Sequence, residues 1–335
     1  MHTIDELRQK QSLPLDIKIK MTEQRIIQWV DNFGIDNVYV SFSGGKDSTV
    51  LLDIAYNIYP GIKAMFVDTG LEYPEIRDFV KAFENVDIIR PKMNFKQVIE
   101  KYGYPFISKE VSQKVYDGRM KPEGYTKKYF IPASEGGKES HYNMAKYKPL
   151  LTAPFTISHK CCFVMKKTPA KKYYKENNRV PITGETAEES VLRTSNWLRH
   201  GCNAYDTKTP VSKPLSFWTE QDILKYIYIK NLKIASVYGK VIEYKKNTDF
   251  DNQIGFEDLN LIDKSVKYKT TGCQRTGCMF CGFGCHIRND ERFLKMKETH
   301  PKQYDFIMKA KEDGGLNYKE VIDWLNDNLN LNIRY

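Results

Sequence analysis

The sequence lacks any long hydrophobic run. No stretch approaches the roughly eighteen consecutive apolar residues that a membrane-spanning helix needs, so no membrane partner is expected. Residues 1–7 also lack the basic end and the apolar stretch of a signal peptide. The seven cysteines are odd in number, and four of them fall between Cys273 and Cys285, which favours a metal site in a reducing compartment over a disulfide framework. The sequence therefore predicts a cytoplasmic protein.

Acidic residues are in the minority. The chain of 335 residues has 52 Lys and Arg against 42 Asp and Glu, a formal charge of +10. Such an excess attracts polyanions over long range, and nucleic acid is the obvious candidate. A lysine-rich composition of the kind that AT-rich genomes encode explains the same excess, so charge alone leaves the partner open.

A glycine turn between a strand and a helix is the clearest chemical signal. Residues 38–42 are mostly β-branched or aromatic, Gly44 and Gly45 interrupt them, and helical spacing resumes after Lys46. Two glycines let successive backbone N–H groups point at one place, which also faces the positive end of the helix dipole. Flanking serines add hydroxyl donors and Lys46 adds a mobile charge, so the turn predicts a phosphate site.

The loop is not the phosphate loop of kinases and GTPases, because the spacing G-x-x-x-x-G-K-[ST] is absent. Ser-Gly-Gly-Lys-Asp-Ser after a hydrophobic strand instead resembles the pyrophosphate (PP) loop of ATP pyrophosphatases, which cleave ATP between its α and β phosphates. A Gly-Gly turn with a chance lysine is the alternative, and the complete strand–loop–helix context disfavours it.

Strands and helices alternate after this loop. Strand-like runs at 62–67 and 86–89 enclose a helix at 75–83, with no hairpin dipeptides between them, which predicts an α/β fold with a doubly wound parallel sheet. We expect an N-terminal helical segment over 1–35, a nucleotide-binding domain over 36–235, and a cysteine-rich segment with a small helical C-terminal region over 236–335.

Residues 117–150 lose this periodicity and predict a long basic and aromatic loop within the nucleotide-binding domain. Lys128 and Lys138 lie in it. Such a loop suits a nucleic acid backbone, and a solvated surface loop is an equal alternative.

Two later segments complete the nucleotide-binding pattern. Residues 183–193 follow a strand-like run and hold carboxylates, a serine and an arginine. Residues 210–222 place a Ser or Thr helix cap before an amphipathic helix. Taken alone, either segment would be ordinary structure.

Together these segments resemble the phosphoadenosine phosphosulfate (PAPS) reductase family of adenine nucleotide α-hydrolases over residues 20–290. In character the chain is closest to the iron–sulfur sulfur-transfer enzymes of DNA phosphorothioation. The resemblance implies catalytic roles for Lys46, Asp47 and Ser48. It implies these nucleotide-binding residues: Ser41, Ser43, Gly44, Gly45, Lys46, Asp47, Ser48, Asp68, Thr69, Gly70, Gly184, Ser190 and Arg193.

Three departures bear on the branch of the family. The PP-loop is intact here, whereas true sulfonucleotide reductases generally carry a degraded one. No Glu-Cys-Gly-Leu-His segment is present, so the usual thiol nucleophile of the reductases is missing from this sequence. Thr186 stands where relatives often have arginine, which leaves the contact to sulfate or γ-phosphate in doubt.

The cysteine spacing C-x4-C-x2-C-x3-C predicts a metal site held by Cys273, Cys278, Cys281 and Cys285. The resemblance favours a [4Fe–4S] cluster over Zn²⁺ at this site, because the related phosphorothioation enzymes and one reductase branch carry such a cluster. Cys161 and Cys162 resemble the paired cysteines of adenylylsulfate reductases and form a rival ligand pair or sulfur-carrying thiols. Cys278 and Cys281 belong to the ligand set under either scheme.

The resemblance implies an enzyme that binds ATP with Mg²⁺. A substrate oxygen would attack the α-phosphate of ATP and form an adenylated intermediate. Sulfur from the cluster or from a cysteine persulfide would then displace AMP, with a cysteine desulfurase as a candidate donor. The expected acceptor is nucleic acid, or an adenylated small molecule. The alternatives are a sulfonucleotide (PAPS or adenylylsulfate) reductase of sulfate assimilation and a nucleotide-sensing or nucleic-acid-binding subunit without turnover.

Overall fold

The computed structural model describes residues 1–137, 143–245, 266–287 and 290–335. Its residues group into two compact units, and the chain passes between them several times. The first unit contains residues 1–68, 72–89 and 171–276, and the second contains residues 69–71, 90–170 and 277–335. The predicted boundaries near residues 35 and 235 stay a prediction about domains.

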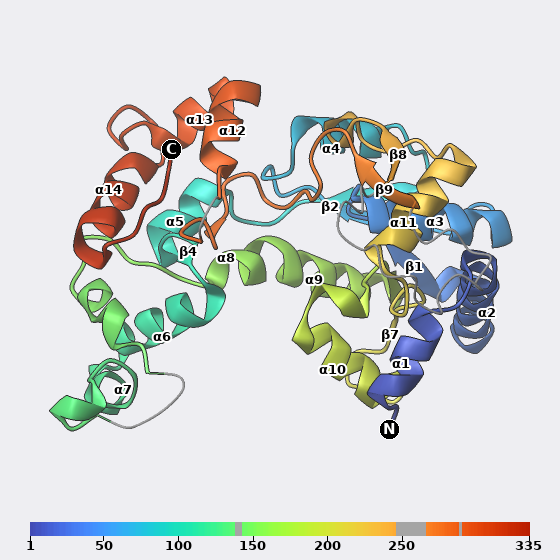
Figure 1. Ribbon diagram of the computed structural model, residues 1–335, viewed down its shortest axis with the longest axis horizontal. Coiled ribbons are helices and arrows are strands. Elements are labelled where there is room, and N and C mark those ends of the chain that lie inside the picture. Colours follow the sequence, from blue (N-terminus) through green and yellow to red (C-terminus); the bar gives the residue numbers. More distant parts are fainter. Residues whose placement is uncertain (138–142, 246–265, 288–289) are drawn as a thin grey trace, which may run out of the picture. The chain divides into compact units, whose positions relative to one another are not determined.

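The first unit is built on a six-stranded sheet in the order β3-β2-β1-β5-β7-β6. Figure 1 labels β1, β2 and β7 of this sheet. The first three strands along the chain are β1 (Val38–Ser41), β2 (Ala64–Val67) and β3 (Val86–Ile89). The later three are β5 (Val180–Thr183), β6 (Asn203–Ala204) and β7 (Val211–Ser212). All neighbours are parallel except β6 and β7, so the predicted parallel sheet is confirmed with one antiparallel edge strand that was not predicted.

The strand order reverses at β1. Strands β2 and β3 extend to one side of it, and β5 lies on the other side in register, with Val38 opposite Val180 and Ser41 opposite Thr183. In open parallel sheets, ligands bind outside the carboxyl ends of the strands at such a switch point. The topology therefore places a binding crevice where β1 and β5 end.

Helices flank this sheet. Helix α3 (Lys46–Ile58) packs against α2 (Leu15–Phe33) and α11 (Glu220–Lys230). Its side chains Val50, Leu51 and Ile54 are at most 1% exposed and belong to one continuous core. Removing such apolar surface from water is the main term that stabilises the unit.

The other helical segments of the first unit are shorter. They are α1 (Ile4–Gln11), α4 (Pro74–Lys81), α10 (Val191–His200) and the later part of α9 (Thr168–Asn177). Strands β8 (Val241–Lys245) and β9 (Val266–Thr270) form a separate antiparallel pair.

The second unit is mainly helical. Its helices are α5 (Phe95–Tyr102), α6 (Lys109–Met120), α7 (Pro122–Tyr129), α8 (Lys160–Cys162), α12 (Arg292–Thr299), α13 (Pro301–Met308) and α14 (Tyr318–Leu329). A short parallel pair joins β4 (Phe106–Ile107) to β10 (Gly282–Phe283). A π-helical turn at Phe163–Lys167 follows α8 directly.

The long loop predicted over residues 117–150 is wrong in part. Helix α6 continues to Met120, α7 follows, and a 3-10 segment spans Ala145–Leu151. Lys138 lies outside the described residues. None of the helices within the described ranges combines the length and the apolar character that crossing a bilayer requires.

Candidate functional site

The loop between β1 and α3 is shaped by a glycine that has no room for a side chain. Gly44 has φ +70°, and a Cβ there would lie 2.7 Å from Cγ2 of Ile76 and 2.9 Å from Cγ2 of Val80 on α4. Both the left-handed backbone and this close approach require glycine. Gly44 therefore packs the loop against α4, and the turn directs the following residues into the crevice.

Two serines hold the loop closed. The Ser43 backbone N–H donates to Ser48 Oγ at 3.2 Å, and the two hydroxyl oxygens lie 2.9 Å apart. Ser48 Oγ also donates to the Gly45 carbonyl at 2.9 Å. The first turn of α3 is thereby fixed with its N–H groups and the positive end of its dipole toward the end of β1.

A second glycine lets β5 approach this turn. Gly184 follows β5, and a Cβ on it would lie 3.0 Å from the Asp47 carbonyl oxygen and 3.1 Å from Ser48 Cα. Backbone atoms cannot move aside as a flexible side chain can. A glycine at this position therefore brings the strand end against the start of α3 and closes the crevice on that side.

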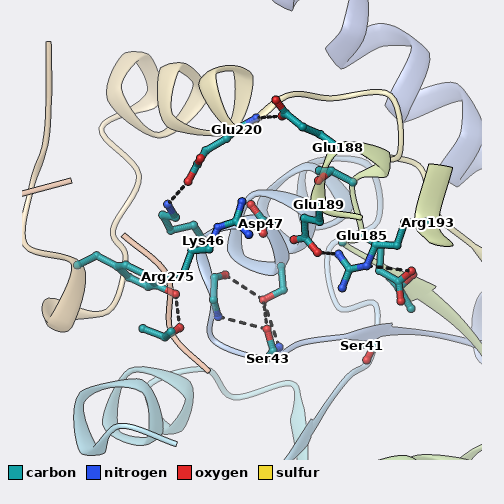
Figure 2. A pocket seen from close by; sticks show the side chains of 17 residues that line it. Ser41, Ser43, Lys46, Asp47, Glu185, Glu188, Glu189, Arg193, Glu220 and Arg275 are labelled. Atoms are coloured by element: carbon teal, nitrogen blue, oxygen red, sulfur yellow. Dashed lines mark hydrogen bonds and ion pairs between the residues drawn. The ribbon is translucent and has the colours of Figure 1, made fainter. Parts of the chain in front are cut away.

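A cavity of about 430 Å³ lies within the first unit at this point (Figure 2). This volume is in the range of small-molecule sites. Residues from both strand ends, the start of α10, the first turn of α11 and the segment after β9 contribute to its wall. The lining residues are Ser41, Ser43, Gly45, Lys46, Asp47, Ser48, Thr183, Gly184, Glu185, Thr186, Glu188, Glu189, Arg193, Glu220, Tyr238, Arg275 and Thr276.

Charged side chains dominate the wall, and most of them are paired. Lys46 Nζ lies 3.2 Å from Glu220 Oε1, with the Lys46 side chain 6% exposed. Arg193 forms an ion pair with Glu189. Burial raises the pKa of Asp47, and the nearby charge of Lys46 offsets part of that increase. The lining contains more carboxylates than cations, so it provides oxygen ligands for a metal ion as well as donors for phosphate.

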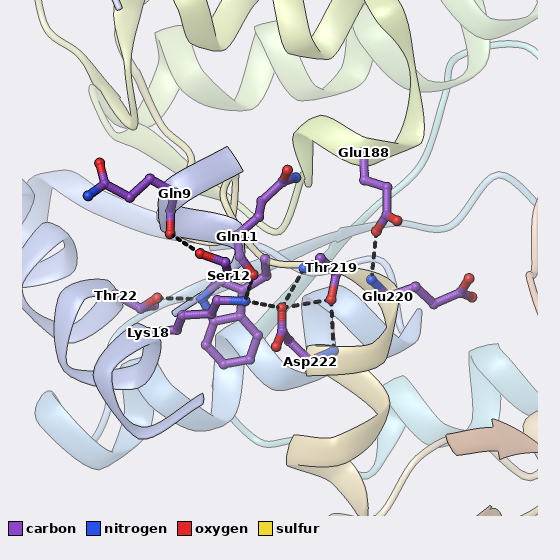
Figure 3. Close-up of polar contacts among 10 residues, drawn as sticks. Gln9, Gln11, Ser12, Lys18, Thr22, Glu188, Thr219, Glu220 and Asp222 are labelled. Carbon is purple, nitrogen blue, oxygen red and sulfur yellow. Dashed lines mark hydrogen bonds and ion pairs between the residues drawn. The ribbon is translucent and has the colours of Figure 1, made fainter. Parts of the chain in front are cut away.

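The first turn of α11 is anchored to α2 by a buried lysine (Figure 3). Lys18 on α2 is 1% exposed, and its Nζ lies 2.6 Å from Asp222 Oδ2 and 2.5 Å from the Gln11 carbonyl. The same Asp222 oxygen accepts from the Thr219 N–H at 2.7 Å, and Asp222 N–H donates to Thr219 Oγ1 at 3.2 Å. This capping box fixes the turn that carries Glu220.

The structure brings most of the predicted nucleotide-binding residues together. Eight of them line the cavity: Ser41, Ser43, Gly45, Lys46, Asp47, Ser48, Gly184 and Arg193. Their role in binding a nucleotide stays a prediction.

Five predicted residues are not among the lining residues of this cavity. Gly44 faces α4. Asp68, at the end of β2, accepts a hydrogen bond from Arg77 at 3.0 Å, and Thr69 Oγ1 accepts from the Leu71 N–H at 3.1 Å. Gly70 lies in the second unit with Thr69. Ser190 caps α10, because its Oγ accepts from the Arg193 N–H at 3.3 Å.

Sequence reasoning missed several lining residues, and Tyr238 and Arg275 are the most informative. Tyr238 is 2% exposed, and its hydroxyl shares a hydrogen bond with the Thr276 hydroxyl. A basic residue between two cysteines was the available signal for Arg275. Glu220 was signalled only by the helix cap before it.

The predicted metal-binding cysteines divide between the units. Cys273 belongs to the first unit, and Cys161, Cys162, Cys278, Cys281 and Cys285 belong to the second. Cys161 is 6% exposed; burial raises the pKa of its thiol, and the nearby thiols of Cys278, Cys162 and Cys281 add to the increase. Burial also raises the pKa of Cys285, to about 12.

No group of three or more Cys, His, Asp or Glu side chains within the described ranges has the arrangement of a metal site. The seven cysteines, all of which lie within the described ranges, form no disulfide. The rival pair, Cys161 and Cys162, belongs to the same unit as Cys278, Cys281 and Cys285. The choice of ligand set stays a prediction.

The chain is similar to known proteins over most of its length. Residues 37–130 and 126–282 match the phosphoadenosine phosphosulfate reductase domain family. The uncharacterized protein MJ0973 of Methanocaldococcus jannaschii is 23% identical over 291 residues, which cover 85% of this chain and 50% of that protein. This chain therefore spans half the length of that relative.

Two enzymes are also similar. Sulfate adenylyltransferase subunit 2 of Photobacterium profundum is 24% identical, covering 71% of this chain and 74% of that protein. Adenosine 5'-phosphosulfate reductase of Staphylococcus haemolyticus is 25% identical over 103 residues, 29% of this chain and 42% of that enzyme.

Among solved structures, phosphoadenylyl-sulfate reductase from Candida auris aligns with a TM-score of 0.38 and 17% identity, covering 67% of this chain and 91% of that one. The family match includes both strand ends and the loop that opens α3. The chain therefore belongs to the phosphoadenosine phosphosulfate reductase domain family.

Proposed function

We propose that this protein binds ATP in the cavity at the ends of β1 and β5 and transfers its adenylyl group to an acceptor, with release of pyrophosphate. The observation that carries the proposal is the start of α3, where the serine-fixed loop, Lys46 and the helix N-terminus converge on one cavity. The relative named as a sulfate adenylyltransferase subunit supports adenylyl transfer as the reaction class.

The first turn of α3 and the hydroxyl groups of Ser43 and Ser48 would hold the phosphates. An acceptor oxygen forms a bond to the α-phosphorus while the bond from that phosphorus to the bridging oxygen breaks, and pyrophosphate leaves with the electron pair. Negative charge develops on the leaving oxygen. Lys46 exchanges its ion pair with Glu220 for this charge, so its interaction strengthens as the bond breaks.

The carboxylates of the lining fit Mg²⁺, which prefers oxygen ligands. Asp47, Glu188 and Glu220 are the residues that would hold it. When bound, the ion neutralises phosphate charge. This chain's own contribution is to place lining carboxylates beside Lys46 and Arg193 and to orient the phosphates.

The proposal predicts that Lys46→Ala lowers conversion of ATP to AMP and pyrophosphate by at least about a hundredfold. Lys81→Ala is the matched control, because Lys81 is an exposed lysine that pairs only with Asp78 at 3.1 Å. The assay quantifies AMP, ADP and pyrophosphate with sulfate or nucleic acid as the acceptor. Release of ADP and orthophosphate, or undiminished turnover by Lys46→Ala, would refute the mechanism.

Sulfur transfer is the finer part of the proposal. The proposed ligands of a [4Fe–4S] cluster or Zn²⁺ are the thiols of Cys161, Cys162, Cys278 and Cys281, because thiolate is the preferred ligand of both and the charges of these thiols affect one another. A bound cluster supplies redox and sulfur chemistry. The thiols' own contribution is a ligand set that is buried at Cys161 and half-buried at the other three. An anaerobic absorption spectrum with iron and zinc analysis of wild type and Cys281→Ser tests it.

The proposed sulfur acceptor is nucleic acid, supported by the formal charge of +10, and the proposed sulfur donor is a cysteine desulfurase. The relative's designation as subunit 2 also supports a partner subunit. Purification with and without nuclease tests the acceptor, because bound nucleic acid would be lost only after nuclease. A protein that elutes free of nucleic acid in both cases and retains no affinity for it would exclude this acceptor.

A sulfonucleotide reductase is the second candidate, favoured by the match to adenosine 5'-phosphosulfate reductase. Thioredoxin-dependent release of sulfite from adenylylsulfate, without pyrophosphate release from ATP, would establish it in place of adenylyl transfer.

A further inference from the structure

Arg275 differs from the other two cations of the cavity. Lys46 is paired with Glu220, and Arg193 is paired with Glu189. Among the described residues, no carboxylate lies within ion-pair distance of the Arg275 guanidinium, and the side chain reaches the cavity beside Lys46 and Asp47 (Figure 2). An anionic ligand can therefore bind Arg275 without displacing a carboxylate.

The backbone that carries Arg275 is fixed. Gly272 N–H donates to the Tyr238 carbonyl and Cys273 N–H donates to the Val237 carbonyl, each at 2.9 Å. Thr270 Oγ1 donates to the Cys273 carbonyl at 2.9 Å. These bonds hold the segment just before Arg275 against the 3-10 turn at Ser236–Tyr238.

Tyr238 also connects this segment to the phosphate loop. Its hydroxyl oxygen lies 2.5 Å from the Thr276 hydroxyl oxygen, and the two share a hydrogen bond. The Lys46 ammonium lies 5.7 Å from the centre of the Tyr238 ring. One buried side chain therefore contacts both the residue after Arg275 and the lysine that opens α3.

We propose that Arg275 binds the phosphates of ATP that leave as pyrophosphate and thereby distinguishes ATP from AMP. The inference rests on the proposed function, since it assigns a role within the same site. A planar guanidinium can donate two parallel hydrogen bonds to phosphate oxygens, which an ammonium cannot. The acid-rich lining makes an unpaired cation the group best suited to select a polyphosphate.

The test compares dissociation constants for ATP, inorganic pyrophosphate and AMP by titration calorimetry in wild type, Arg275→Ala and Arg275→Lys. We expect Arg275→Ala to raise the dissociation constants of ATP and pyrophosphate by about tenfold to a hundredfold. The dissociation constant of AMP should stay within about twofold of the wild-type value. Arg275→Lys should bind ATP and pyrophosphate with affinities between those of wild type and Arg275→Ala, because lysine keeps the charge and loses the two parallel hydrogen bonds. Arg8→Ala is the control, since the Arg8 side chain is 73% exposed and pairs with Asp5 on α1.

Two results would overturn the inference: unchanged ATP and pyrophosphate affinity in Arg275→Ala, or an equal loss for AMP, which would mark a structural role. Failure of the proposed function gives a different result. In that case wild type itself would bind no ATP, and the pyrophosphate titrations would still report on Arg275.

Discussion

Two buried lysines bind the same turn of α11, and they are built differently. Lys18 is 2% exposed in its side chain and pairs with Asp222, whose side chain is 14% exposed. Lys46 is 6% exposed and pairs with Glu220, whose side chain is 42% exposed. Lys18 also donates to the Gln11 carbonyl, and its partner completes a helix cap. Lys46 instead faces a cavity.

The difference separates a structural ion pair from one that a ligand can replace. Breaking a buried pair leaves a charge that neither water nor another partner can reach. A pair with one solvated member contributes little, so its lysine can change partner at small cost. Lys18 therefore holds α11 in place, and Lys46 is available to a phosphate.

The largest expected effect is on the buried ion pair of Lys18 and Asp222. Lys18→Met leaves the Asp222 carboxylate without its cation and should lower the free energy of unfolding by about 3–5 kcal/mol, measured by urea denaturation. The double variant Lys18→Met with Asp222→Asn buries no unpaired charge and should recover part of this loss. A double variant less stable than Lys18→Met would show that the pair is not the source of the effect.

The ion pair of Lys46 and Glu220, which has one solvated member, should tolerate the same change in its lysine. Lys46→Met is expected to cost at most about 1 kcal/mol in the same experiment, because Glu220 is solvated. If it destabilised the protein as much as Lys18→Met does, the distinction between the two lysines would be wrong.

Changing the acidic partner sharpens the comparison further. Glu220→Gln should alter stability by no more than about 0.5 kcal/mol. It should tighten binding of pyrophosphate in EDTA by about fivefold, because Lys46 no longer has to leave a carboxylate. Asp222→Asn, two residues along the same turn, is the control and should destabilise the protein clearly. Weaker binding by Glu220→Gln in EDTA would contradict an exchange of partners at Lys46.

The smallest effect concerns Asp47. Burial raises its pKa above the ordinary 3.8, so the folded protein holds this proton more tightly than the unfolded chain does. The resulting stabilisation is fully present below about pH 3.8 and is lost as pH rises through the folded-state pKa. Asp47→Asn carries no such proton and should be slightly more stable than wild type at neutral pH, with the difference vanishing in acid. Urea midpoints across pH measure this, and a less stable variant at pH 7 would show that the carboxylate makes net favourable contacts.

Local signals predicted the part of the site that is local in sequence. The strand, the glycine turn and the start of α3 follow one another, so apolar periodicity and turn residues predicted all three. Gly184 was equally visible after a strand. The face that Gly44 presents to α4 was not predictable, because it depends on how α4 packs against the loop.

The rest of the site is assembled from distant segments. Tyr238 and Arg275 are brought together because the N–H groups of residues 272–273 donate to the carbonyls of residues 237–238, and no periodicity encodes that pairing. Ser190 caps α10, a role that its sequence context did not distinguish from a ligand contact, and its predicted contact with the nucleotide stays a prediction. The cysteine spacing predicted one group, and the chain places Cys273 in a different unit from the other three.

The pairing of β1 with β5 has a consequence for how the molecule forms. Val38 lies opposite Val180 in the sheet, so residues 90–170 of the second unit are synthesised after one of these neighbouring strands and before the other. Loop-closure entropy makes such distant contacts slow to form. On a ribosome, the nascent chain would expose the edge of β1 until residue 183 has emerged, and chaperone demand should be greatest in that interval.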